Sequence, residues 1–229
     1  MGTVELKEWT IKDPLNCIGY NAGVCWSAPT DSDHNVKRAL GCIKDGHGRV
    51  EELPDVYVVL DGWSAKCLRE LYTHIGGAPT RMQASTRYID YEKNFNIVMP
   101  PSVEKNEEAK KVWNETIAAV QQGMTKLKEL EVPKEDYTNL LPLAYESKMI
   151  WKVNLRTLIN FFGMRLCNRA YWEIRQLSKQ LKDALAAYSS EWKIIADELF
   201  LPKCEQTGYC TERQCCGRKP KKEDVLNSD

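Results

Sequence analysis

Alternation of apolar and polar positions is clearest in residues 55–62, DVYVVLDG. β-branched side chains predominate there, and a period of two is typical of a strand inside a sheet. Weaker alternation predicts further strands at residues 4–11, 93–101 and 143–154. With the helical segments between them, these strands predict an α+β fold with a mixed or antiparallel sheet and several long helices.

A helical period runs through much of the remaining chain. Its longest example follows Ser102, a predicted N-cap, and has an apolar stripe that we expect in the core or in a subunit contact. The stripe comprises Ala109, Val112, Trp113, Ile117, Val120, Met124 and Leu127. Shorter helices are predicted at residues 36–44, 65–75 (capped by Ser64), 169–188 and 190–201, whereas residues 17–35 predict loop and short turns.

Residues 154–175, NLRTLINFFGMRLCNRAYWEIR, interleave apolar residues with cationic and amide side chains. A helix over the first part offers a buried side for the core. It also places Arg156 and Asn160 about 40° apart on another face. Polar groups held there need water, an anion or a ligand.

The second half of this stretch predicts a corner between two helices. Gly163 predicts the end of the first helix, and Asn168 is a good N-cap for the next one. Arg165 would then lie in the short connection, beside a helix N-terminus where anions are favoured. The corner therefore predicts an anion-binding site.

Two further polar segments allow both a functional and a plain interpretation. Residues 78–91 form an irregular segment dense in donors, which suits either a ligand or a solvated loop; its polar members include Arg81, Gln83, Ser85, Thr86 and Arg87. His47 lies between two glycines, where a surface loop histidine is the plain interpretation.

Charge and composition exclude several classes of partner. The 229 residues include 32 basic and 32 acidic side chains, so no overall field attracts nucleic acid or an anionic membrane. No apolar run approaches the roughly 20 residues that span a bilayer, and the N-terminus lacks the pattern of a signal peptide. We expect a cytoplasmic protein with one domain at residues 1–203 and a partly disordered, cysteine-rich tail at 204–229.

Nine cysteines are many for such a chain, but their spacing is scattered and the number is odd. In the tail they are Cys204, Cys210, Cys215 and Cys216, and Cys167 could complete a four-sulfur set in space. Free thiols in a reducing compartment are the expectation, and metal ligands or a disulfide remain the alternatives. No residue is assigned to a metal site.

Known catalytic motifs are missing from the sequence. It has no GxSxG element, phosphate loop or dinucleotide fingerprint, and no paired carboxylates in the polar segments. The remaining polar inventory is cationic, with amides and hydroxyls around it. Such a set suits an anionic, hydrogen-bonding ligand such as a nucleotide.

The stretch at 154–175 closely resembles the C-terminal motif of flavin-dependent thymidylate synthases, N-x-R-S/T-L followed by R-x-x-x-x-A-Q-W-E-I. The loop motif of that family, Arg-His-Arg then Ser-x-Arg, resembles His74 and the run from Ser85 to Arg87. The resemblance spans about residues 17 to 200. It implies an α+β homotetramer of the thymidylate synthase-complementing type, with active sites between subunits.

The resemblance also implies a reaction. FAD, methylenetetrahydrofolate as carbon donor and NAD(P)H (NADPH as the expected reductant) would convert dUMP to dTMP without a protein nucleophile. Arg165 resembles the catalytic arginine, which stabilises negative charge on the pyrimidine. Flavin contacts are implied for His47, His74, Asn154, Arg156, Asn160 and Arg169, and substrate contacts for Glu70, Arg81, Gln83, Ser85, Thr86, Arg87 and Arg165.

Several positions depart from the family pattern. Both arginines of Arg-His-Arg are replaced, since the sequence reads Thr73-His74-Ile75, and Arg81 is the candidate to restore a cation. Gln83 stands where the family usually has Glu, and Thr138 where an arginine often meets the nucleotide phosphate. A flavin-contacting carboxylate aligns equally well with Glu51 or Glu52.

Two other functions remain compatible with these residues. One is a flavin-dependent pyrimidine nucleotide hydroxymethylase on the same fold. The other is a non-catalytic flavin- or metal-binding interaction protein.

Overall fold

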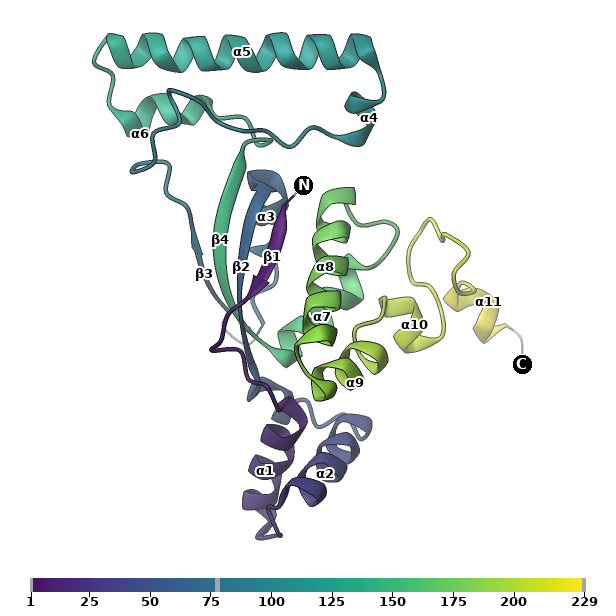
Figure 1. Cartoon of the computed structure of the whole chain (residues 1–229). Helices are drawn as coiled ribbons and strands as arrows, with labels where there is room; N and C mark the ends of the chain where they lie inside the picture. Colours follow the sequence, from purple (N-terminus) through teal and green to yellow (C-terminus); the bar gives the residue numbers. More distant parts are fainter. Residues whose placement is uncertain (1, 77–78, 228–229) are drawn as a thin grey trace. The chain divides into compact units, whose positions relative to one another are not determined.

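The computed structural model describes residues 2–76 and 79–227 and contains a four-stranded antiparallel sheet (Figure 1). Its strands, in spatial order, are β1 (Thr3–Leu6), β2 (Asp55–Ser64), β4 (Glu146–Asn154) and β3 (Thr80–Gln83). The predicted central strand is confirmed as β2, in which Val56, Val58 and Leu60 are fully buried. The α+β class is confirmed as well.

The strand predicted at 143–154 is confirmed as β4, which begins three residues later. The remaining strand predictions were less accurate. β1 is shorter than the predicted strand at 4–11. Residues 93–101 form no strand, and only Ile97 pairs with Tyr145 in an isolated bridge. β3 was missed because it lies at the end of the strand order, where the sequence TRMQ needs no apolar face.

Residues 17–35, predicted as loop and turns, belong largely to two packed helices, α1 (Pro14–Trp26) and α2 (Ser32–Lys44). Gly19 is a contact point: a Cβ on it would lie 1.8 Å from the carbonyl oxygen of Asn35. The first N–H groups of α1 are satisfied by Glu191, whose Oε2 accepts from Leu15 N at 2.7 Å. Close approach and a remote cap, neither visible in the local pattern, explain the error.

The described residues group into two compact units. Unit 1 holds residues 60–71 and 82–149 with the N-terminal residues up to Thr3. Unit 2 holds residues 4–59, 72–81 and 150 onwards, and so includes the tail. Strands β2 and β4 each contribute residues to both units. The predicted boundary at residue 204 stays a prediction.

Unit 1 contains α3 (Ala65–Leu71), α4 (Pro101–Glu104), α5 (Glu107–Glu129), α6 (Lys134–Tyr137) and the 3-10 turn η2 (Thr138–Leu140). Ser64 caps α3 as predicted, since its Oγ accepts from Cys67 N at 3.0 Å. That helix ends at Leu71, before the predicted end. The cap of α5 is Asn106, which accepts from Ala109 N at 3.1 Å, and not Ser102. The chain turns through α4 before the long helix begins.

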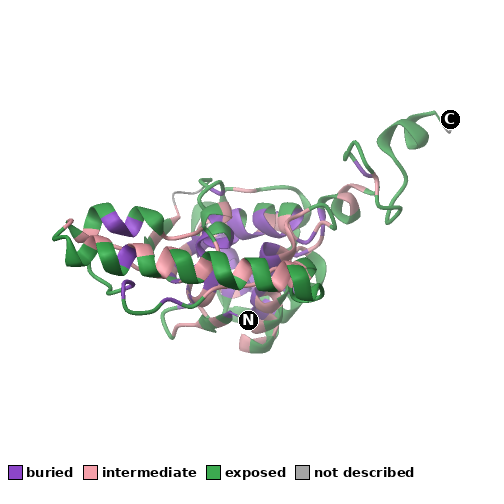
Figure 2. Ribbon diagram, turned by 90° about the horizontal axis from the view of Figure 1, so that it is seen from above, coloured by how far each residue is buried: buried purple, intermediate pink, exposed green. Residues whose placement is uncertain are grey.

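The stripe on α5 divides into two halves. Met124 is fully buried, and Ile117, Val120 and Leu127 pack on the cluster around it. The other half is open: Val112 is 63% exposed and lies with its neighbours along a groove of about 530 Å³. Figure 2 shows the long helix coloured as exposed or intermediate over most of its length. The predicted core role therefore holds for the C-terminal half.

Unit 2 contains α1, α2, the 3-10 turn η1 (Val50–Glu52), α7 (Leu155–Arg165), α8 (Trp172–Tyr188), α9 (Ser190–Glu198), α10 (Lys203–Thr207) and α11 (Lys222–Leu226). Its core is aromatic, with Phe161 packed edge-on against Trp151 and Phe162 stacked near Phe200. The Trp192 indole also donates to Ile11 O at 2.7 Å. Among the helices described, none combines the length and the apolar character needed to cross a membrane.

Candidate active site

Helix α7 begins directly at the end of strand β4, and Asn154 makes this junction. Its side chain accepts from Thr157 N at 3.0 Å, so Asn154 is the N-cap of α7. Thr157 Oγ1 in turn donates to Gly76 O. The predicted helix is thus anchored at its first turn to the segment that carries His74.

The exposed face of α7 carries Arg156 and Asn160, as the helical period predicts. Arg156 donates to Glu52 Oε1 at 2.6 Å. Hydrogen bonding to Arg156 lowers the pKa of Glu52. The neighbouring Glu51 differs, because burial raises its pKa. Of the two alignable carboxylates, Glu52 is therefore the one that pairs with the α7 arginine.

The loop that contains His47 passes close to the same arginine. A Cβ on Gly48 would lie 3.3 Å from the Arg156 guanidinium carbon, so the backbone approaches the cation closely. His47 itself lines a cavity of about 450 Å³ together with residues of α1 and η1. The backbone beside His47 thus approaches Arg156, but the cavity that His47 lines includes neither Arg156 nor Glu52, and the predicted flavin contact of His47 stays a prediction.

A second cluster surrounds His74, which is only 5% exposed. Its ring packs edge-on against Phe161, with centroids 5.1 Å apart. Arg165 Nε donates to His74 Nε2 at 3.0 Å, and Arg165 Nη2 donates to Thr73 Oγ1 at 3.0 Å. Arg81 Nη1 lies 3.4 Å from the carbonyl oxygen of His74. The predicted flavin ligand His74 and the predicted catalytic residue Arg165 are therefore in direct contact.

Burial lowers the pKa of His74 to about 4, helped by the positive charges of Arg165 and Arg81. At neutral pH the ring is therefore uncharged. Because Nε2 accepts from Arg165, the ring proton resides on Nδ1. That nitrogen is buried and has no hydrogen-bond partner among the described residues. A buried donor without a partner suits a ligand that supplies an acceptor.

The corner after α7 differs from its prediction. Gly163 does not end the helix, which continues to Arg165, and Asn168 does not cap the next helix, which begins at Trp172 after Tyr171. Gly163 is buried, and a Cβ there would lie 3.3 Å from the side chain of Gln206. The glycine therefore permits close packing and is not a stop signal. Arg165 lies at a helix C-terminus, which favours a cation.

The predicted substrate residues Glu70, Gln83, Ser85, Thr86 and Arg87 belong to unit 1. Gln83 donates to Ser147 Oγ at 3.1 Å, and Arg87 pairs with Glu135 at 3.1 Å. Thr138, noted as a departure, is buried in the same unit. Their roles toward a ligand stay predictions.

Two further positions complete the comparison with the sequence. Arg169 is exposed and lines a cavity with several cysteines, and its predicted flavin contact stays a prediction. Thr73, which binds Arg165, was not selected from the sequence. Its only signal was its place beside His74 in a segment where the family has arginine.

Comparison with known proteins identifies the family of the chain. The profile of the family described as thymidylate synthase complementing protein matches residues 5–188. A flavin-dependent thymidylate synthase of Pyrococcus furiosus is 34% identical over 93% of this chain and 91% of its own length. One of Clostridium tetani is 28% identical over 94% and 93%. The chain belongs to the thymidylate synthase complementing protein family.

Proposed function

We propose that this protein is a flavin-dependent thymidylate synthase that converts dUMP to dTMP, with methylenetetrahydrofolate as the carbon donor and NAD(P)H as the reductant. Its relatives of similar length carry that name. The observation that carries the proposal is the contact between Arg165 and the buried, neutral His74. It joins the two motifs by which the sequence resembles that enzyme.

The residues of unit 2 fit a bound flavin. The ring system of FAD has polar edge atoms, and the buried Nδ1 of His74 is a donor that lacks a protein partner in the described chain. Arg156, with Asn160 one helical turn further on, presents amide and guanidinium donors on an exposed face. FAD, when bound, supplies hydride transfer between NAD(P)H and the pyrimidine.

In this proposal Arg165 acts on the pyrimidine. A guanidinium held by His74 and Thr73 is oriented before substrate arrives, so it stabilises negative charge on the ring as C5 becomes nucleophilic. A second cation, Arg81, lies over the ring of Tyr72, 4.7 Å from its centroid. No protein nucleophile is needed in this chemistry.

We also propose that the segment from Ser85 to Arg87, with Glu70 and Gln83, binds the nucleotide, and that the enzyme is a homotetramer. The open half of the α5 stripe supports an oligomer, because it leaves an apolar groove at Val112, Trp113 and Pro142. Light scattering after size-exclusion chromatography tests the mass. A monomer at micromolar concentration would overturn the tetramer.

The activity is tested by incubating the FAD-loaded protein with dUMP, methylenetetrahydrofolate and NADPH, and identifying the product by mass spectrometry. dTMP supports the proposal. A hydroxymethylated nucleotide would overturn it in favour of the hydroxymethylase. Protein that takes up no FAD and forms neither product would indicate the non-catalytic alternative.

A further inference from the structure

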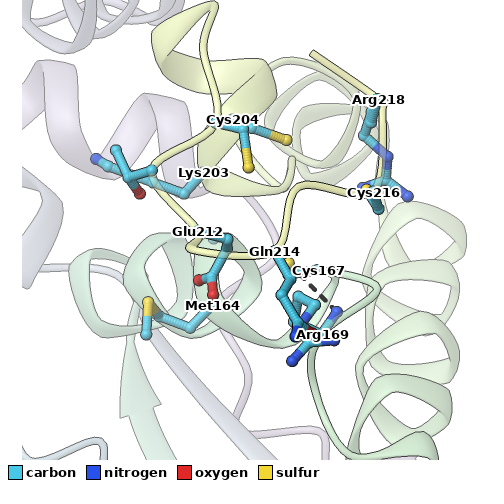
Figure 3. Close-up of a pocket in the computed structure, with 12 residues that line it drawn as sticks. Met164, Cys167, Arg169, Lys203, Cys204, Glu212, Gln214, Cys216 and Arg218 are labelled. Carbon is cyan, nitrogen blue, oxygen red and sulfur yellow. Dashed lines mark hydrogen bonds between the residues drawn. The ribbon is translucent and has the colours of Figure 1, made fainter. Parts of the chain in front are cut away.

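Five cysteines of unit 2 lie close together although they come from two distant parts of the chain. Cys167 follows α7, Cys204 lies in α10, and the others are in the tail. Four of them, Cys167, Cys204, Cys210 and Cys216, line a single cavity of about 60 Å³ (Figure 3). All nine cysteines lie in the described part of the chain, and each is a free thiol there.

The backbone around these sulfurs is folded to donate hydrogen bonds to them. Arg169 N donates to Cys167 Sγ at 3.5 Å, and Gly217 N donates to Cys215 Sγ at 3.3 Å. In both cases the donor is two residues after the cysteine. Metal-bound thiolates use such N–H donors, whereas a thiol is only a weak acceptor.

The cavity is lined by more cations than carboxylates. Three cations, Arg169, Lys203 and Arg218, line it with a single carboxylate, Glu212. Figure 3 shows Arg169 close to Cys167, and Arg218 beside Cys216. Cys210 is buried, although most of the tail residues around it are exposed (Figure 2). Cations that line a cavity together with several cysteines can offset the negative charge of thiolates.

We propose that Cys167, Cys204, Cys210 and Cys216 bind one Zn²⁺ ion as a closed tetrathiolate site. Four Zn–S bonds form as the four thiols release four protons to solvent, and no electrons are transferred. The resulting centre carries two negative charges beside three cations, of which Arg218 also pairs with Glu205 at 3.5 Å. Four sulfur ligands select Zn²⁺ or an iron–sulfur cluster, and the small cavity suits a single ion.

Binding includes a movement of the tail. No three His, Cys, Asp or Glu side chains in the described ranges already surround one point as metal ligands do. Zn–S bonds are about 2.3 Å long, so the sulfurs close inward on the ion. The contacts that guide this closure are present: Arg218 reaches Leu166 O at 3.5 Å and Asn168 Oδ1 at 3.3 Å. The ion would thereby fasten the tail to the turn that follows Arg165.

Cys215 provides a matched control, because it is a neighbour of Cys216 in the sequence but not part of the cavity lining. Its thiol donates to Lys219 O at 3.2 Å, and its sulfur accepts from Gly217 N. Loss of this thiol removes a sulfur of the same tail without removing a proposed ligand.

The test is metal analysis of the full chain, purified without an affinity metal from medium that contains zinc and iron. We expect one equivalent of zinc in the wild type and in Cys215→Ser, and at least a tenfold loss in Cys204→Ser and Cys210→Ser. Wild-type protein without zinc, zinc retained in Cys204→Ser, zinc lost in Cys215→Ser, or iron with acid-labile sulfide in place of zinc would each overturn the proposal.

A second measurement needs no variant and therefore does not depend on whether the variants fold. An organomercurial that modifies thiols should release one equivalent of zinc from the wild type to a chromophoric chelator. Cobalt-loaded protein should show the thiolate charge-transfer band of a tetrahedral site. Failure of both would overturn the proposal. Neither readout requires FAD, so the outcome is independent of the proposed enzymatic activity.

Discussion

Helix α7 holds two arginines with opposite kinds of partner, one near each end. Arg156 is 55% exposed in its side chain and pairs with the carboxylate of Glu52. Arg165 is half-buried and donates to the imidazole of His74, which at neutral pH has no charge. The first contact is an ion pair in water, where Coulomb attraction is weak. The second is a directional bond in a buried corner and depends on the protonation state of its acceptor.

The comparison shows that one helix can hold two cations in different surroundings. At the Arg156 end, the cation is accessible and its partner can be exchanged for another anion. At the Arg165 end, His74 and Thr73 fix the direction of the guanidinium. We expect substitutions at Arg165 to change chemistry, and those at Arg156 to change affinity.

Arg165→Ala should have the largest effect. Loss of one oriented donor at developing negative charge lowers kcat by about a hundredfold to a thousandfold. Single-turnover kinetics with FAD-loaded protein measures the change, and the visible spectrum should show that flavin is still bound. Arg69→Ala, at an exposed position of α3, is the control. Full activity of Arg165→Ala would contradict the assigned role.

Acidification should have the next largest effect, because it destabilises the contact between His74 and Arg165. The pKa of His74 falls from 6.5 to about 4 in the folded protein, so its contribution to stability is intact above pH 6.5. As the pH falls from 6.5 toward 4, His74 is protonated in the unfolded chain but stays neutral in the folded protein, so the unfolded state is favoured. The free energy of unfolding should then decrease by at most about 2 kcal/mol between pH 7 and 5, less where solvent screens the ring.

Urea denaturation of the wild type and of His74→Gln at both pH values isolates this contribution. The variant should lose less stability on acidification, since glutamine does not titrate. His34→Gln is the matched control, because His34 is exposed beside Asp31. An equal loss in the wild type and His74→Gln would show that another group causes the pH dependence.

Arg156→Gln should have a smaller effect, on binding alone. Loss of an exposed cation beside the proposed flavin should lower the affinity for FAD by about tenfold, which corresponds to the loss of one charge-assisted hydrogen bond. Fluorescence titration of the apoprotein with FAD measures it. Lys193→Gln removes a comparable exposed ion pair on α9 and should leave the affinity unchanged. Unchanged affinity in Arg156→Gln as well would remove this residue from the flavin site.

The sequence predicted the two arginines more easily than it predicted their surroundings. The period of α7 places Arg156 and Asn160 correctly, because a helical face depends only on local spacing. The contact between Arg165 and His74 joins residues 91 positions apart, and no local pattern encodes it. For the same reason Gly163 was mistaken for the end of a helix, and the segment around Gly19 for a loop, although each glycine allows a second segment to pack closely. Contacts with remote segments decide whether a glycine ends a helix or allows close packing within it.

Glu52→Gln should have the smallest effect and tests the comparison most directly. The pair with Arg156 is solvent-exposed, so the urea midpoint at pH 7 should stay within error of the wild type. Hydrogen bonding lowers the pKa of Glu52 from 4.5, so its contribution is present above pH 4.5 and is lost only as the pH falls further. Between pH 7 and 5, Glu52→Gln should therefore lose as much stability as the wild type, because the substitution removes no group that titrates in that range and leaves His74 unchanged. A flatter pH dependence in this variant would mean that the exposed end of α7 is coupled to the buried one, and the two arginines would then have to be treated as one site.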